Sequence, residues 1–237
     1  MHSAPQYLKI QSLFQRDPET KYKTLLEGIY STPEFESLAQ TPIWRFEEKV
    51  DGTNLRVQIT PTKLWFHGRT DKAQIPPHLQ ERLSDLFSGE RLAGLREAFP
   101  RGVVLYGEGY GNKVQKVGHR YRPDQGFLMF DAVTLDQGTG ELNWLQREAL
   151  ESVAEAHDLE IAPVVGRGTL LEAVELIREE GLYSRVAQES MLAEGVVIKT
   201  DPLLRDKRGV PVITKLKHAD FRLPQPESKA KTATTEA

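Results

Sequence analysis

The chain has 237 residues, of which 39% are hydrophobic and 27% charged, a formal net charge of −3 at pH 7, and no cysteine. This length suits one large domain, and the lack of cysteine excludes disulfides, thiolate zinc sites and cysteine nucleophiles. The sequence has neither an apolar run of about 18 residues nor the apolar core of a signal peptide, so we expect an intracellular, cytoplasmic protein without a membrane span.

The first half of the chain is predicted to contain a short helix, three strands and two further helices. After Asp17-Pro18, helical spacing predicts a short helix through Tyr22, Leu25, Leu26 and Ile29. Strand-like runs follow at residues 44–50, 55–60 and 63–67. After Pro76-Pro77, one helical pattern carries Leu79, Leu83, Leu86 and Phe87, and the next carries Leu92, Leu95 and Phe99.

The second half alternates apolar strands with helical segments. Strands are predicted at 102–108, 127–133, 161–165, 195–199 and 210–217, and a helix at 145–157. Thr169 and Glu172 have the spacing of a capping box that opens another helix. From Leu223 onward the sequence is polar and has no apolar period, which predicts one domain over residues 1–222 and a disordered tail over 223–237.

The order of these elements favours an α+β fold. It lacks the regular strand–helix alternation of parallel sheets, so we expect curved antiparallel sheets flanked by helices. A negative net charge also means that any surface for a nucleic-acid backbone must be local, because such proteins usually present a basic face. Short basic clusters that could contribute are Lys113 with Lys116, Arg120 with Arg122, and Arg205 with Lys207 and Arg208.

The segment Lys49-Val50-Asp51-Gly52 allows two interpretations. Asp-Gly between two strand-like runs is a strong hairpin signal, and Lys49 is then an ordinary surface lysine. Alternatively, Lys49 is a nucleophile. The attacking form of an amine is the neutral one, whereas an unperturbed lysine has a pKa of about 10.4, so nearby cations or desolvation are needed.

A divalent metal ion would meet this need, because it disfavours a neighbouring ammonium and neutralises phosphate oxygens. Carboxylates suit Mg²⁺ or Mn²⁺, which bind oxygen ligands and retain water. The candidate direct or outer-shell holders of such a metal are Asp51, Glu108 and Glu194.

Three later lysines occur in strand-like surroundings. Lys215 and Lys217 are two residues apart, so both side chains share one face of a strand, either toward a pocket or as a solvated basic face. Lys199 follows a buried apolar run. Phe130, in a predicted core strand, is either a core residue or a platform on which a purine stacks.

Taken in order, six motifs resemble those of covalent nucleotidyltransferases. They are Lys-x-Asp-Gly-x-Asn at 49–54, Gly-Arg-Thr at 68–70, Tyr-Gly-Glu at 106–108, Phe-Asp at 130–131, Glu-Gly-Val-Val-Ile-Lys at 194–199 and Lys-Leu-Lys at 215–217. More narrowly, the chain resembles the adenylyltransferase domain of RNA ligases of the RNA ligase 2 type, a nucleotidyltransferase (ATP-grasp-like ligase) fold. The similarity covers about residues 6–222.

The resemblance implies a role for each motif residue. Lys49 would take AMP from ATP as a phosphoramide, Glu194 would organise the catalytic Mg²⁺, and Lys199, Lys215 and Lys217 would bind phosphate oxygens. The implied nucleotide contacts are Glu48 beside adenine, Phe130 stacked on adenine with Asp131 beside it, Arg69 on the nucleotide or an RNA phosphate, Glu108 on the ribose or the metal shell, and Asn54 in the later sealing step.

The function that the resemblance implies is ATP-dependent RNA ligation through lysyl-AMP and RNA-adenylate intermediates. The RNA could be a nicked duplex or an RNA–DNA hybrid. Relatives of this type carry a further domain after the Lys-x-Lys strand, whereas only a short polar segment follows Lys217 here, so we expect a protein partner to replace that domain. The alternatives are a DNA ligase-like or capping-like enzyme, and a non-catalytic nucleic-acid-binding relative.

Overall fold

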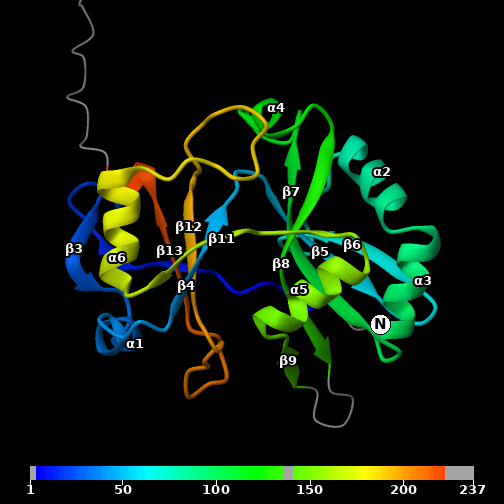
Figure 1. Ribbon diagram of the computed structural model, residues 1–237, viewed down its shortest axis with the longest axis horizontal. Coiled ribbons are helices and arrows are strands. Elements are labelled where there is room, and N and C mark those ends of the chain that lie inside the picture. The colour runs from blue at the N-terminus through cyan, green and yellow to red at the C-terminus, as the bar shows by residue number, and fades with distance from the viewer. Residues whose placement is uncertain (1–3, 136–140, 222–237) are drawn as a thin grey trace, which may run out of the picture.

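The computed structural model describes residues 4–135 and 141–221, and in this part of the chain most strands form two sheets that lie side by side (Figure 1). The first sheet has the order β1 (Gln11–Ser12), β13 (Ile213–Lys217), β12 (Gly195–Thr200), β4 (Trp44–Lys49) and β11 (Val164–Gly168). The second has the order β10 (Glu160–Ile161), β8 (Gln125–Leu135), β7 (Val103–Gly111), β5 (Thr53–Ile59) and β6 (Leu64–Gly68), with β9 (Leu142–Trp144) on β8. Strands β2 (Phe14–Arg16) and β3 (Leu25–Tyr30) form a separate pair.

Most strand pairs are antiparallel, as predicted; β1 with β13 and β10 with β8 are parallel. The helices are α1 (Pro33–Leu38), α2 (Pro77–Leu86), α3 (Gly89–Ala98), α4 (Gly118–Tyr121), α5 (Arg147–Ala156) and α6 (Leu170–Glu175). A π-helical turn, Leu176–Glu180, follows α6, and a 3₁₀ turn, His218–Phe221, follows β13. The α+β prediction is therefore confirmed. Within the described residues, no helix is both long and apolar enough to cross a membrane.

Each sheet has its own hydrophobic core. Phe46, Val196 and Leu216 of the first sheet pack with Leu170 and Val174 of α6. In the second sheet the core joins strands β5, β7 and β8 to the helices α2, α3 and α5. Side chains alternate along a strand, so Arg45, Glu47 and Lys49 point to the face of β4 opposite Trp44 and Phe46. That face is left for polar residues.

The turn at Asp51-Gly52 does not close a hairpin. Strand β4 pairs with β12 and β11 in the first sheet, whereas β5 pairs with β6 and β7 in the second. The turn therefore carries the chain from one sheet to the other. A Cβ atom at Gly52 would lie 2.4 Å from the carbonyl oxygen of Gly109 and 2.7 Å from Cγ of Glu108, so this close approach requires glycine.

Several sequence predictions need correction. The helix predicted through Tyr22 and Ile29 is wrong: residues 17–24 turn between β2 and β3, and Leu25–Tyr30 is a strand. Local spacing favoured a helix there, but pairing with β2 overrides it. The strand predicted at 161–165 is divided between β10 and β11, in different sheets.

Other elements were predicted correctly. The helices after Pro76-Pro77 and the central strands lie where expected, and the Thr169–Glu172 capping box is present. The predicted tail, 223–237, lies outside the described residues, so the proposed division of the chain at residue 222 stays a prediction.

Candidate active site

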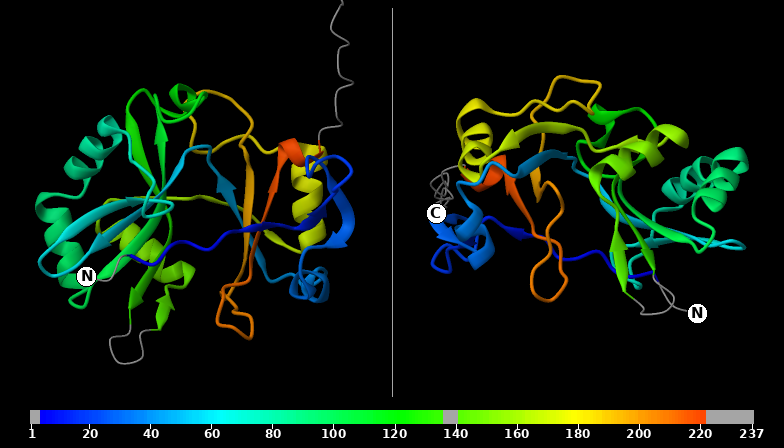
Figure 2. Two further views of the ribbon diagram at one scale, coloured as in Figure 1. Left: turned by 180° about the vertical axis from the view of Figure 1, so that it is seen from behind. Right: turned by 60° about the horizontal axis from the view of Figure 1, so that its bottom comes forward.

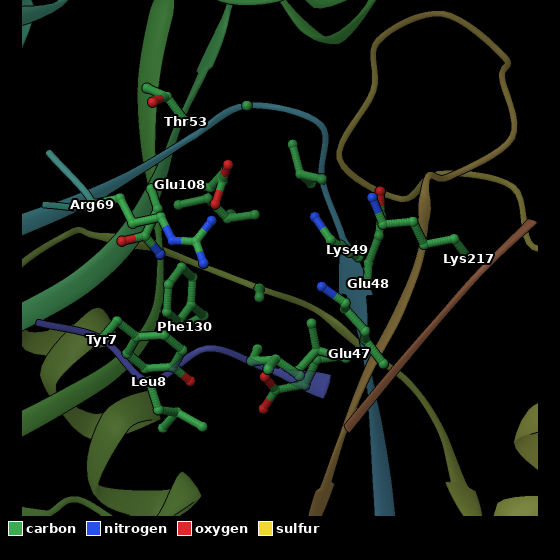
Figure 3. Close-up of a pocket in the computed structure, with 18 of the residues that line it drawn as sticks. Tyr7, Leu8, Glu47, Glu48, Lys49, Thr53, Arg69, Glu108, Phe130 and Lys217 are labelled. Atoms are coloured by element: carbon green, nitrogen blue, oxygen red, sulfur yellow. The ribbon is translucent and has the colours of Figure 1, made fainter. Parts of the chain in front are cut away.

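A pocket of about 470 Å³ lies between the two sheets (Figure 3). Arg69, Glu108 and Phe130 stand on one side, and Lys49 and Lys217 on the other. The pocket is lined by Tyr7, Leu8, Lys9, Ile10, Glu47, Glu48, Lys49, Val50, Gly52, Thr53, Asn54, Arg69, Glu108, Leu128, Phe130, Ala162, Val197, Lys215 and Lys217. Most of the sequence-predicted site residues therefore converge here, from five of the six motifs; Asp51, Asp131, Glu194 and Lys199 are not among the lining residues.

Lys49 and Lys217 share one carboxylate. In the register of the first sheet, Gly195 pairs with Lys49 on one side and with Lys217 on the other, so Glu194 emerges between the two lysines. Its Oε2 lies 2.7 Å from Nζ of Lys49, and its Oε1 lies 2.5 Å from Nζ of Lys217. Burial raises the pKa of Glu194, but the charges and hydrogen bonds of the two lysines outweigh burial and hold its pKa below the usual value.

Lys215 lies on the same face of β13, opposite Val197 of β12. Of the two alternatives considered for Lys215 and Lys217, a pocket or a solvated basic face, the structure favours the pocket, since both residues line it. Burial lowers the pKa of Lys215, and the positive charges of Lys217 and Lys49 lower it further. The ammonium groups of Lys49 and Lys217 thus share the Glu194 carboxylate, and Lys215 adds a third ammonium on the same wall, an arrangement suited to an anion such as a triphosphate.

Glu108 and Asn54 form the opposite wall, where they are paired in the register of β5 and β7. Burial, together with the negative charges of Glu194 and Asp51, raises the pKa of Glu108 to about 7, although Lys49 opposes this. Oδ1 of Asn54 is buried and has no hydrogen-bond partner among the described residues. Such a buried acceptor is one that a bound ligand can satisfy.

The structure does not bring the predicted metal holders together as a coordination set. Within residues 4–135 and 141–221, no group of three or more His, Cys, Asp or Glu side chains is arranged to hold a metal ion. Both carboxylate oxygens of Glu194 contact lysines, which accounts for the difference. Burial and the charge of Glu194 raise the pKa values of Asp51 and Glu108, and a cation beside these carboxylates would lower them again. Because, of the three predicted holders, only these two form no ion pair with a lysine of the described residues, a cation here would take most of its ligands from water.

The ring of Phe130 forms part of the pocket wall. It lies 5.0 Å from the ring of Tyr7 at an interplanar angle of 69°, an edge-to-face arrangement. It is half-buried and lines the pocket, so the position fits either of the two roles considered for it, core residue or base platform.

Lys199 and Asp131 lie outside the pocket, contrary to their expected roles beside phosphate and adenine. Both are buried, and Nζ of Lys199 lies 3.0 Å from Oδ2 of Asp131 and 2.9 Å from Oε2 of Glu47. The same ammonium donates to the backbone carbonyl of Phe130 at 2.7 Å. Lys199 therefore joins the first sheet to the second. Its positive charge is paired with the buried carboxylates of Glu47 and Asp131.

Glu48 and Arg69 differ in what holds them. The Glu48 carboxylate accepts hydrogen bonds from the hydroxyl of Ser184 and, at 2.7 Å, from the backbone N–H of Arg185. Glu48 thus borders the pocket and fixes the 184–185 segment. Arg69 is exposed at the end of β6, with its guanidinium directed toward the pocket in Figure 3.

Sequence reasoning missed two parts of the site. Glu47 was recoverable, since alternation along β4 places it on the same face as Lys49. It also joins Arg147 of α5 to the buried network, with Nη1 of Arg147 3.2 Å from Oε1. The N-terminal residues 7–10 carry no motif and no clear period, so nothing local indicated that they would reach the pocket.

The chain is similar to RNA ligases in both family and fold. The family model described as RNA ligase matches residues 42–217, which is most of the chain. No curated protein sequence matches. Among solved structures, a Naegleria gruberi RNA ligase with PPi has a TM-score of 0.58 and 17% identity over 88% of this chain and 56% of its own.

Two further solved structures of RNA ligases are also similar to this chain in fold. An archaeal ATP-dependent RNA ligase has a TM-score of 0.59 and 18% identity, covering 91% of this chain and 49% of its own. A mutant of the Naegleria gruberi enzyme with ATP and Mn has a TM-score of 0.55 and 16% identity over 78% of this chain and 52% of its own. The chain thus spans about half the length of these proteins and shares their fold. By the match over residues 42–217, this chain belongs to the RNA ligase family.

Proposed function

We propose that this chain joins RNA ends in an ATP-dependent reaction in which Lys49 carries AMP. The observation that supports this most directly is the placement of Lys49 beside Glu194, with Lys215 and Lys217 on the same face of the pocket. The pocket thus combines one amine nucleophile, two further cations for phosphate and an aromatic wall. The related Naegleria gruberi structures contain ATP with Mn, or AMP with Mn, which is consistent with this proposal.

In the first step, Nζ of Lys49 attacks the α-phosphorus of ATP. The N–P bond forms, the bond to the bridging oxygen of pyrophosphate breaks, and the proton that Nζ then loses passes to water. Glu194 orients the amine through its 2.7 Å contact, and Lys215 and Lys217 neutralise the triphosphate and the departing pyrophosphate. Positioning and charge neutralisation supply most of the catalysis, which agrees with a pocket rich in cations.

The adenine is proposed to lie against Phe130, with Glu48 at the border of the same pocket. Glu108 and Asn54 face the sugar or the phosphate from the second sheet. The buried Oδ1 of Asn54 would gain a partner when substrate binds. Asp131 and Lys199 take part indirectly, since they fix the backbone of Phe130.

Mg²⁺ or Mn²⁺ is the metal we assign to this reaction, with Asp51 and Glu108 as the residues that would hold it, mostly through water. When bound, such an ion neutralises charge on phosphate oxygens and disfavours a nearby ammonium. Glu194 contributes by placing the two lysines rather than by completing a coordination cage.

The later steps transfer AMP to the 5′-phosphate of RNA and then displace it with a 3′-hydroxyl. We propose that Arg69, which lines the pocket and is exposed, contacts an RNA phosphate in these steps. The substrate is proposed to be RNA in a nicked duplex or an RNA–DNA hybrid. A duplex substrate holds both RNA ends together in register, so it is the substrate used in the test.

Incubation with labelled ATP, GTP and NAD, each separately, tests the proposal. We expect ATP to give a covalent adduct of one AMP. A nicked duplex whose strands at the nick are RNA should then consume this adduct. An adduct from GTP alone would indicate a capping-like enzyme, and sealing restricted to DNA would indicate a DNA ligase. No adduct with any of them would leave a non-catalytic nucleic-acid-binding relative.

A further inference from the structure

The N-terminal segment, residues 4–12, crosses from the second sheet to the first. At its start, the guanidinium of Arg56 donates to the carbonyl oxygen of Ala4, and the hydroxyl of Tyr106 donates to that of Pro5 at 3.0 Å. At its end, Gln11–Ser12 pairs with β13. Figure 2 shows the segment, in blue, passing between the two halves of the molecule. Both ends are therefore held, and residues 7–10 between them line the pocket.

Tyr7 is the most firmly held of these lining residues. Its side chain is packed among three aromatic rings, with centroid distances of 5.0 Å to Tyr106, 5.0 Å to Phe130 and 5.7 Å to Trp144. Tyr7 is only 8% exposed, and its hydroxyl donates to Oδ2 of Asp131. Ring and hydroxyl thus contact two adjacent residues of β8.

Asp131 receives a second donor from the first sheet. Nζ of Lys199 lies 3.0 Å from the same oxygen, Oδ2, and also binds the carbonyl of Phe130. The backbone of Phe130 is therefore fixed by Lys199, while Tyr7 packs edge-on against its ring. Nζ of Lys199 also lies over this ring, 5.8 Å from its centroid, so Tyr7 restrains the ring from the N-terminal segment and Lys199 restrains it from the first sheet.

We propose that Tyr7 is a positioning residue of the nucleotide site, which holds the ring of Phe130 in the orientation that accepts the base. This inference rests on the function proposed above, in which Phe130 stacks on adenine. The N-terminal segment then forms a functional part of the wall of the ATP pocket. Since Tyr7 acts on the base platform and not on Lys49, its loss should weaken ATP binding while leaving the rate at saturating ATP nearly unchanged.

The test uses the full chain and measures single-turnover adenylylation over a range of ATP concentrations. Tyr7→Ala should raise the half-saturating ATP concentration about three- to ten-fold, the range expected for losing an aromatic pair, and change the maximal rate by less than about two-fold. Tyr7→Phe keeps the ring and should recover most of the affinity. Tyr22→Ala is the matched control, because Tyr22 is 63% exposed and lies on the turn between β2 and β3.

A double-mutant cycle separates positioning from general support of the fold. In a Phe130→Leu background, Tyr7→Ala should add little further loss of ATP affinity, because the ring it positions is gone. Thermal unfolding of each variant, without nucleotide, shows how much of the effect is structural. If Tyr7→Ala fails to fold, Tyr7→Leu in both backgrounds carries the same comparison, because it removes the ring and keeps apolar bulk at the position.

Three results would overturn the inference: unchanged half-saturation in Tyr7→Ala, a loss confined to the melting temperature, or a loss fully additive with Phe130→Leu. A wild-type chain that binds ATP in calorimetry yet forms no AMP adduct would instead refute the proposed function. Calorimetric ATP affinity of the same variants then decides the role of Tyr7. A wild-type chain that binds no ATP would overturn both.

Discussion

Nζ of Lys49 lies 2.7 Å from Oε2 of Glu194, although the two residues are far apart in the sequence. The contact depends on Gly195, which stands opposite Lys49 in the register of β4 and β12. A Cβ atom at Gly195 would lie 2.0 Å from the carbonyl oxygen of Leu216 in β13, so only glycine lets the start of β12 lie this close to β13, the strand that carries Lys217. The nucleophile is thus oriented by sheet register.

Replacing Lys49 by alanine is expected to abolish the AMP adduct and to leave the fold intact. Lys49 ends β4, and its side chain is 22% exposed, so its removal opens no hole in either core. Intact mass after incubation with ATP measures the adduct, and thermal unfolding reports on the fold. Lys63→Ala, on the loop before β6, is the matched control. A mass increase of one AMP in Lys49→Ala would refute the assignment.

Removing divalent metal is expected to reduce the rate of adenylylation by about 100-fold or more, since only the lysines would then neutralise the negative charge of the triphosphate. Metal-stripped protein in excess EDTA is compared with the same protein after addition of Mg²⁺ or Mn²⁺, either of which should restore the adduct. Zn²⁺ should not, because the pocket offers oxygen donors and no thiolate. Full adenylylation in EDTA would contradict this prediction.

Lys199 and Lys215 should give opposite results when each is changed to methionine. Lys199→Met leaves the carboxylates of Glu47 and Asp131 buried without their shared cation, so we expect a loss of about 3–5 kcal/mol in the free energy of unfolding. Lys215→Met should change that free energy by less than about 1 kcal/mol, because Lys215 is half-buried at the pocket wall.

The adenylylation rate completes the comparison. Lys215→Met should slow it at least about ten-fold through loss of one charge-assisted phosphate contact. Denaturant unfolding and single-turnover kinetics are measured on both variants. A stable Lys199→Met protein with slow adenylylation would show that Lys199 reaches the phosphates, as the family resemblance implied.

The stability of the first sheet should depend on pH through Asp201. Nη1 of Arg45 lies 3.0 Å from its Oδ1, and Arg167 binds its other oxygen. Burial raises the pKa of Asp201, but the bond with Arg167 and the charge of Arg45 outweigh burial and lower it. The carboxylate therefore stabilises the fold above its unfolded pKa of about 3.9, and the effect is lost as pH falls through the lower, folded pKa.

Asp201→Asn is the variant that tests this. We expect it to cost about 1–3 kcal/mol of unfolding free energy at pH 7, as for a hydrogen-bonded charge, and the difference from wild type to shrink below about pH 4. Urea unfolding at a series of pH values measures it. Asp85→Asn, on α2, serves as the control, and a difference that stays constant down to pH 3 would argue against the prediction.

Much of the site could be predicted from the sequence, for local reasons. The period of two placed Lys215 and Lys217 on one face, and the structure confirms that both line the pocket. Residue types and short-range spacing determine such features, because side-chain direction along a strand does not depend on the partner strand. The expectation that Lys49, Glu108, Glu194 and Phe130 belong to one site came instead from the resemblance of the ordered motifs to covalent nucleotidyltransferases.

Only the tertiary structure decided which strands are partners and how deep each side chain lies. Asp51-Gly52 suits a hairpin, yet β4 and β5 join different sheets, since their long-range pairing outweighs the preference of the turn. Lys199 shares a strand face with Val197 of the pocket wall but lies one pair further along β12, where Glu47 and Asp131 enclose it. Tyr7 reaches Asp131 across 124 positions of sequence, a contact that no local pattern encodes.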